Sequence, residues 1–329
     1  MRKVKILGFS VAVLLICMVS WGIVYATTTD QTETQIDATE KQEEGIKELG
    51  KAEFISVAAT HKGTIELNWE KAANANQYEV YRKEKGKGEY QLLATTKKTK
   101  YVDKSGQVHV TYVYQIRPIM TDAQKEIIGI GEKSQAVKCK VRKKNPKVAY
   151  AGDSIMTGFS VYNVLKGKKN ARVFAGVGLN TGSFASSKEM KSLLKYNPDR
   201  LYIMLGVNSL WSTDSKRLNS MWSQYEKILK KCHKKNPNME IIVVGVAPVG
   251  KGAKISQKAV TKFNKLLKKK VSKKADMYYC DISESMSNAK GYLLPEYGAG
   301  DGIHWKSSTY RHVLKQWDNF AKKIYWYEQ

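Results

Sequence analysis

The chain has 329 residues, 42% of them hydrophobic, and a formal net charge of +26. This length is sufficient for more than one domain. One of its four Cys lies in an apolar N-terminal segment, which leaves Cys139, Cys232 and Cys280 as an odd set. The count argues against a disulfide framework, and no Cys/His spacing typical of a metal site occurs.

The positive charge lies beyond the N-terminal end. Residues 1–53 hold 6 of the 56 basic and 8 of the 30 acidic side chains, so the remainder carries 50 against 22. Such an excess favours an anionic cell-wall polymer or a membrane surface as a partner. The alternative is that these lysines lie on outer helix faces and only keep the protein soluble.

The N-terminal segment has the composition of an export signal. Arg2, Lys3 and Lys5 precede residues 6–26, which carry no charge. This pattern predicts either a signal peptide cleaved near Ala26 or an uncleaved signal-anchor helix, and the length of the segment favours the anchor. In both cases the rest of the chain is expected outside the cell membrane, so nucleic acid is not an expected partner.

Residues 27–52 are rich in Thr, Gln and Glu and contain no aromatic residue. They cannot bury enough surface to offset their chain entropy, which predicts a flexible polar stalk. An all-β region is predicted for residues 53–143, because apolar and polar residues alternate in short runs between Gly, Asn and Lys clusters. About 90 residues of this pattern predict a two-sheet sandwich.

The sandwich pattern resembles a fibronectin type III domain. The resemblance rests on Trp69, the run Tyr78–Arg82, and the pair Tyr112 and Tyr114. Such a module serves either as a spacer or as a carbohydrate-binding or wall-binding unit.

Residues 147–329 alternate buried strand patterns with helical patterns, which predicts a parallel sheet covered on both faces. The expected strands are Val148–Ala151, Ala171–Phe174, Leu201–Leu205, Ile241–Val246 and Met277–Cys280. The expected helices are Ser187–Leu194, Ser215–Lys235, Lys258–Ser272 and Ser308–Trp326.

Polar residues follow these strands in a particular order. Gly152-Asp153-Ser154 ends the first strand, Gly206-Val207-Asn208 follows the third, and Asp301-Gly302-Ile303-His304 precedes the last helix. Ser154 needs a base to become a nucleophile, and His304 is the candidate base. Asp301 is close enough within a turn to hold the His304 ring. The alternative, purely structural interpretations are that Asp153 or Ser154 caps a helix and that residues 301–304 form an ordinary turn.

This ordered set resembles the SGNH (GDSL-type) hydrolase family over residues 146–325. The resemblance implies a three-layer α/β/α fold of the flavodoxin-like kind and a serine mechanism without metal or organic cofactor. It also implies an oxyanion hole made by the Ser154 N–H, a glycine N–H that aligns with Gly178 or falls on Leu179, and the Asn208 side chain. Phe174 stands where the family usually has Asn.

Three neighbours are candidates for a substrate pocket, namely Asp153, Leu179 and Trp305, although Trp305 could instead only pack. The expected function is an exported serine esterase that removes an O-acyl group, such as acetyl, from a cell-surface or dietary glycan or a small ester. The alternatives are a lysophospholipase or lipase, and a non-catalytic wall-binding protein on a hydrolase scaffold.

Overall fold

The computed structural model describes residues 48–60, 62–323 and 326–328. The predicted leader or anchor at 1–26 and most of the predicted stalk at 27–52 lie outside the described residues. Within the described ranges, no helix is both long and apolar enough to cross a membrane. The fold begins slightly before the predicted boundary, because Ala52 is fully buried and the Gly50 N–H donates to the Ala73 carbonyl.

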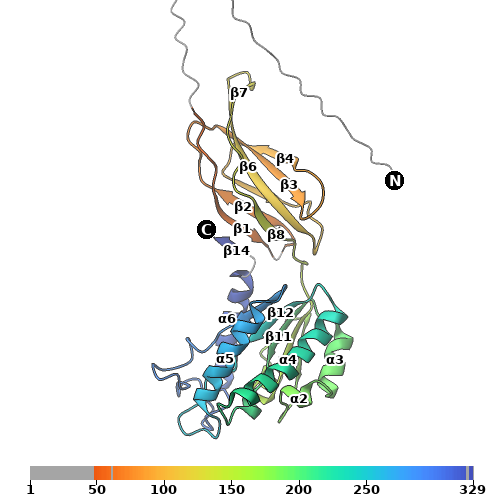
Figure 1. Ribbon diagram of the computed structural model, residues 1–329, viewed down its shortest axis with the longest axis vertical. Helices are drawn as coiled ribbons and strands as arrows, with labels where there is room; N and C mark the ends of the chain where they lie inside the picture. The colour runs from red at the N-terminus through yellow and green to blue at the C-terminus, as the bar shows by residue number, and fades with distance from the viewer. Residues whose placement is uncertain (1–47, 61, 324–325, 329) are drawn as a thin grey trace, which may run out of the picture. The chain divides into compact units, whose positions relative to one another are not determined.

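The region before residue 141 is all-β, and together with one strand from the C-terminal end it forms two sheets of antiparallel strands (Figure 1). One sheet has the order β14-β1-β2-β5, and the other has the order β4-β3-β6-β7 with β8 paired to β6. The strands are β1 (Phe54–Ala59), β2 (Ile65–Trp69), β3 (Gln77–Glu84), β4 (Gln91–Thr96), β5 (Lys100–Asp103), β6 (Thr111–Thr121), β7 (Ile127–Ile130), β8 (Val137–Lys140) and β14 (Trp326–Glu328).

Side-chain alternation explains why these two sheets pack together. In β2, Ile65, Leu67 and Trp69 are buried, while the residues between them are not. They join Tyr78 and Tyr114 from the other sheet in one hydrophobic core, as expected when alternate side chains of a strand share a face. The predicted antiparallel strands are confirmed, whereas the resemblance to fibronectin type III stays a prediction.

The following region is α/β, and its five strands run parallel in the order β10-β9-β11-β12-β13. The strands are β9 (Val148–Gly152), β10 (Ala171–Ala175), β11 (Arg200–Met204), β12 (Glu240–Val244) and β13 (Met277–Cys280). The helices are α1 (Ser154–Val161), α2 (Thr181–Phe184), α3 (Lys188–Tyr196), α4 (Ser215–Lys235), α5 (Gln257–Val271) and α6 (Ser307–Lys323), with a 3-10 turn η1 (Val207–Ser209). The predicted parallel sheet is confirmed.

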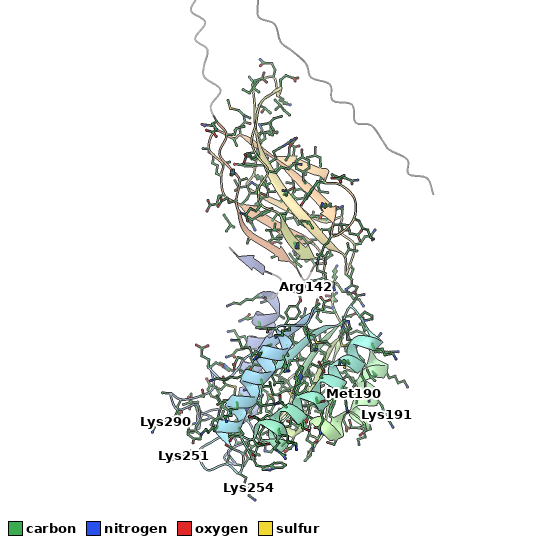
Figure 2. All side chains as sticks on the ribbon, in the orientation of Figure 1. Arg142, Met190, Lys191, Lys251, Lys254 and Lys290 are labelled. Atoms are coloured by element: carbon green, nitrogen blue, oxygen red, sulfur yellow. The ribbon has the colours of Figure 1, made fainter. Side chains whose placement is uncertain are left out.

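Hydrophobic patterning places this sheet in the interior. All five residues of β11 are buried, as expected for a strand covered on both faces. The helices present one apolar side to the sheet. On α3, Met190 is buried in the core while its neighbour Lys191 lies on the outer surface (Figure 2).

The C-terminal part differs from the sequence prediction. A helix was expected over Ser308–Trp326, but α6 ends at Lys323 and residues 326–328 form β14. This strand pairs antiparallel with β1 of the all-β region, with Ser56 opposite Glu328. Pairing of all three residues of β14 with β1 outweighs the helical pattern of the sequence at this end.

Candidate active site

Ser154 is the first residue of α1 and comes directly after β9. Asp153, between them, has extended backbone and caps the helix, because its Oδ1 accepts from the Ile155 N–H at 3.2 Å. The cap leaves the Ser154 N–H at the open first turn of the helix, where amides have no intrahelical acceptor. The local sequence therefore places both a hydroxyl and a free backbone donor at the carboxyl edge of the sheet.

His304 and Asp301 come from the loop before α6, and they meet Ser154 across 150 residues of chain. The His304 Nε2 lies 2.9 Å from the Ser154 Oγ. On the other side of the ring, Nδ1 lies 2.5 Å from the Asp301 Oδ2. The three side chains form one hydrogen-bonded line, which is the arrangement in which an imidazole can remove a hydroxyl proton.

The Asp301 loop is shaped by its own hydrogen bonds. Asp301 Oδ1 accepts from the N–H groups of Ile303 and His304 at 2.9 and 2.8 Å, which makes a tight turn closed by a side chain. Gly302 has φ +76°, a conformation that favours glycine. The turn leaves the other carboxylate oxygen for the His304 ring.

The pKa values of the two acids of the site shift in opposite directions. Partial burial alone would raise the pKa of Asp301, but hydrogen bonds from the His304 ring and from backbone amides lower it to about 2. Burial raises the pKa of Asp153 to about 7, although the nearby N–H groups of Ile155, Gly206 and Val207 act to lower it. The last two N–H groups lie outside hydrogen-bond geometry, since Asp153 Oδ2 has no partner among the described residues. Asp301 is thus the ionised acid beside the histidine.

Asn208 lies in η1, shortly after the end of β11, and its amide points to the loop that contains Leu179. Its Nδ2 donates to the Leu179 carbonyl at 2.8 Å. An amide nitrogen has two hydrogens, so one anchors the 176–180 loop while the other is available to a ligand. The sequence analysis did not predict this hydrogen bond between Asn208 and the loop that holds Gly178 and Leu179.

Gly178 fits a donor role better than Leu179 does. Gly178 has φ +74°, and its N–H has no acceptor among the residues that the structure describes. The Leu179 N–H instead donates to the Gly176 carbonyl at 3.4 Å. Of the two alternatives left open by the sequence, the free amide is therefore that of Gly178.

Two of the three expected pocket residues are buried. Trp305 is 0% exposed and packs on Tyr310, with ring centroids 5.2 Å apart. Asp153 is 1% exposed. Trp305 thus packs in the core and Asp153 caps α1, while their part in a substrate pocket stays a prediction. Leu179 is partly exposed and stays a candidate.

The remaining histidines in the described α/β region lie apart from this line of residues. His312 Nε2 lies 2.7 Å from the Gln316 amide nitrogen on α6, and His233 belongs to the last turn of α4. Within the described ranges, no group of three or more His, Cys, Asp or Glu side chains could hold a metal ion. Ser154, His304 and Asp301 contribute a hydroxyl, an imidazole and a carboxylate to this site.

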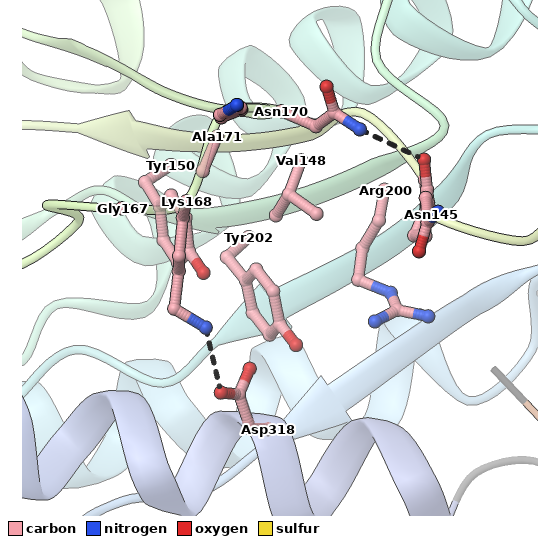
Figure 3. Close-up of a pocket in the computed structure, with 12 residues that line it drawn as sticks. Asn145, Val148, Tyr150, Gly167, Lys168, Asn170, Ala171, Arg200, Tyr202 and Asp318 are labelled. Atoms are coloured by element: carbon pink, nitrogen blue, oxygen red, sulfur yellow. Dashed lines mark hydrogen bonds and ion pairs between the residues drawn. The ribbon is translucent and has the colours of Figure 1, made fainter.

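A cavity of about 350 Å³ lies at the opposite edge of the sheet (Figure 3). Its lining includes Val148, Ala171 and Arg200, each the first or second residue of its strand. Lys168 and Asp318 form an ion pair of 3.3 Å at its mouth. Since ligands of open α/β sheets bind at the carboxyl ends of the strands, this cavity is separate from the Ser154 site.

Sequence reasoning missed Trp211, which lies three residues after Asn208 and is 59% exposed. The Arg217 guanidinium lies over its ring, 3.5 Å from the centroid. Exposure depends on the folded loop, so the sequence carries no direct signal of it. The only indication in the sequence is that an aromatic residue closely follows Gly206-Val207-Asn208.

Comparison with known proteins is consistent with the motif order. Residues 150–312 match the GDSL-like lipase/acylhydrolase family. A search of curated proteins gives no match. Among solved structures, a GDSL-like lipase from Bacteroides thetaiotaomicron is 15% identical with TM-score 0.44, covering 54% of this chain and 90% of that one.

Two further solved structures are similar to part of the chain. A carbohydrate esterase family 3 structure from Talaromyces cellulolyticus is 15% identical with TM-score 0.40, covering 54% of this chain and 96% of that one. An Fn3-like protein from Clostridium thermocellum is 24% identical with TM-score 0.23, covering 28% and 92%. At these scores the likenesses carry no argument about activity or substrate.

The α/β region is thus a parallel-sheet domain with a hydroxyl, imidazole and carboxylate in line at its carboxyl edge. Residues 150–312 form a GDSL-like lipase/acylhydrolase domain of the SGNH type.

Proposed function

We propose that this protein is a serine esterase that works through an acyl-Ser154 intermediate. The observation that carries the proposal is the unbroken line from Ser154 Oγ through His304 to Asp301, with distances of 2.9 and 2.5 Å. The family match of residues 150–312 independently supports a hydrolase that acts on esters.

In the proposed reaction, His304 Nε2 takes the Ser154 proton as Oγ attacks the ester carbonyl. His304 then gives that proton to the leaving alcohol, and the acyl group stays on Ser154. A water molecule, deprotonated by the same nitrogen, attacks the acyl-serine carbonyl; the acyl–oxygen bond breaks, His304 returns the proton to the Ser154 Oγ, and the acid is released. Asp301 stays a carboxylate at neutral pH, because its pKa is about 2, and holds the Nδ1–H of the ring.

Negative charge develops on the carbonyl oxygen in both tetrahedral intermediates and needs fixed donors. The proposed donors are the backbone N–H groups of Ser154 and Gly178 and the second amide hydrogen of Asn208. In the described structure the Gly178 N–H has no acceptor, and the Asn208 amide is held by Leu179. Both features favour donors that need little rearrangement when charge appears.

We further propose that the substrate is an O-acylated glycan, with acetyl as the acyl group. The chain's positive charge and its all-β region suit a protein that works at an anionic cell-wall or membrane surface, and exposed lysines follow one side of α5. Export through residues 1–26 is part of the same proposal. A lysophospholipase or lipase is the nearest alternative, since the family includes lipases by name.

The experiment uses the chain from residue 48 onward with 4-nitrophenyl acetate and a fluorophosphonate probe. Wild type should release nitrophenol and be labelled, and Ser154→Ala should do neither while keeping its melting temperature. Ser160→Ala, an exposed serine on the same helix, is the matched control and should behave as wild type. A Ser154→Ala variant that is labelled at the wild-type rate would place the nucleophile elsewhere. An inactive and unlabelled wild type would favour the non-catalytic wall-binding alternative.

A further inference from the structure

Trp211 is a large apolar side chain that is exposed to solvent close to the catalytic motifs. Trp211 is 59% exposed, although burying an aromatic ring is ordinarily favourable. It follows η1, whose Asn208 points its amide at Leu179. Three residues of chain span at most about 10 Å, so Trp211 lies at the rim of the proposed site.

The Trp211 ring is held in place from one side. The Arg217 guanidinium lies 3.5 Å from the ring centroid, and its Nε donates to the Ser209 carbonyl at 3.0 Å. The loop is also tied behind the ring, because the Ser256 N–H donates to the Leu210 carbonyl at 3.0 Å. One face of the indole is therefore covered by a fixed cation, and its exposed area lies on the other face and the edges.

A fixed aromatic face without a neighbour suits a flat, rigid ligand. The axial C–H bonds of a pyranose ring make an apolar face of that kind. Their hydrogens carry a small positive charge, which complements the electron-rich face of indole. Because the platform is pre-ordered by Arg217, little side-chain entropy is lost on binding.

The surroundings favour a sugar over a lipid surface. Every residue from 212 to 217 is polar or charged, in the order Ser, Thr, Asp, Ser, Lys, Arg. An interfacial lipid-binding surface instead needs an apolar face that enters the acyl region.

We propose that Trp211 is a binding residue that stacks on a sugar ring of the O-acylated glycan, and so determines specificity for the alcohol part of the ester. This proposal rests on the proposed function of Ser154. Trp211 would contact the ring next to the acylated one or the acylated ring itself, while the acyl group is held at Ser154.

The test compares two substrates on three variants. The substrates are acetylated xylo-oligosaccharides, which present sugar rings, and 4-nitrophenyl acetate, which does not. The variants are Trp211→Ala, Trp211→Phe and Tyr90→Ala. Tyr90 is the matched control, because it is a partly exposed ring under a lysine, with the Lys83 ammonium 4.6 Å from its centroid, and lies in the all-β region.

The measured quantity is the ratio of kcat/KM on the oligosaccharide to kcat/KM on the nitrophenyl ester. In Trp211→Ala this ratio should fall about tenfold, which corresponds to about 1.4 kcal/mol of lost binding, mainly through a higher KM. Trp211→Phe should keep most of the ratio, and Tyr90→Ala should keep all of it.

Each other outcome overturns the proposal. An unchanged ratio in Trp211→Ala, with both esters hydrolysed by wild type, would refute the role of Trp211 and leave the serine esterase intact. Loss of hydrolysis of lysophosphatidylcholine micelles in Trp211→Ala, with no change on oligosaccharide, would make the residue a lipid contact. A wild type that hydrolyses neither ester would refute the proposed function itself.

Discussion

Replacing Asn208 by alanine separates a catalytic role from a structural one. The structure gives its amide two uses, a hydrogen bond of 2.8 Å to the Leu179 carbonyl and a second hydrogen that is proposed to face the oxyanion. Loss of the first should cost about 1 kcal/mol of stability, the usual net value of one hydrogen bond. Loss of the second should lower kcat by about 10²–10³-fold, or roughly 2.7–4 kcal/mol in the transition state.

The kinetic signature should be specific. Because the oxyanion forms only in the transition state, kcat and kcat/KM should fall together while KM changes little. Asn208→Asp should be at least as inactive, since a carboxylate would face both the Leu179 carbonyl oxygen and the developing oxyanion. Turnover of 4-nitrophenyl acetate and urea unfolding would be measured on the same preparations.

A matched control is available at the other edge of the domain. Asn236 is also partly buried, and its Nδ2 donates to the Pro198 carbonyl at 3.0 Å. Its Oδ1 also accepts from the Asn238 N–H at 3.1 Å, so Asn236→Ala should lose about 1–2 kcal/mol of stability and keep the wild-type kcat. If Asn208→Ala loses stability and keeps its kcat, the residue is structural and the oxyanion assignment is refuted.

Two further predictions concern α1. Asp153 has a folded pKa of about 7 against 3.8 for the free group, so the folded state binds the proton more tightly and stability should fall as pH rises from about 4 to 7, by at most about 4 kcal/mol. Asp153→Asn should remove this dependence, measured as the free energy of unfolding at pH 4.5 and 8, and equal pH dependence in both proteins would contradict the assignment. A Cβ on Gly158 would overlap the ring of Tyr310, whose hydroxyl donates to the Ile155 carbonyl at 2.8 Å. Gly158→Ala should therefore lower the free energy of unfolding by about 1–3 kcal/mol, and an unchanged melting temperature would show that α1 and α6 can move apart freely.

Much of the α/β domain could be predicted because its strands are apolar runs. Val148–Ala151 and Met277–Cys280 match β9 and β13 within one residue. The four-residue helix α2 could not, since so short an element has no period, and β14 depends on a partner strand far away in the chain. The placement of Ser154 beside His304 followed from a family resemblance, because the chain order alone holds no distance information.

The different exposure of two tryptophans could not be predicted from the sequence. Trp305 and Trp211 both follow a motif residue closely, yet one is 0% and the other 59% exposed. The difference arises from contacts between elements, since Trp305 packs on Tyr310 of α6 and Trp211 has Arg217 on one face. Local sequence does not determine such contacts.

The pairing of β14 with β1 bears on how the chain folds during synthesis. Strand β1 precedes the whole α/β domain and β14 follows it, so on the ribosome β1 waits for its outer neighbour until more than 200 later residues have been made. Meanwhile β1 is an open sheet edge, which is a site for pairing with another chain. Once β14 has formed, its backbone hydrogen bonds to β1 also join the two domains non-covalently. A single protease cut in the segment between the domains should therefore leave both halves associated.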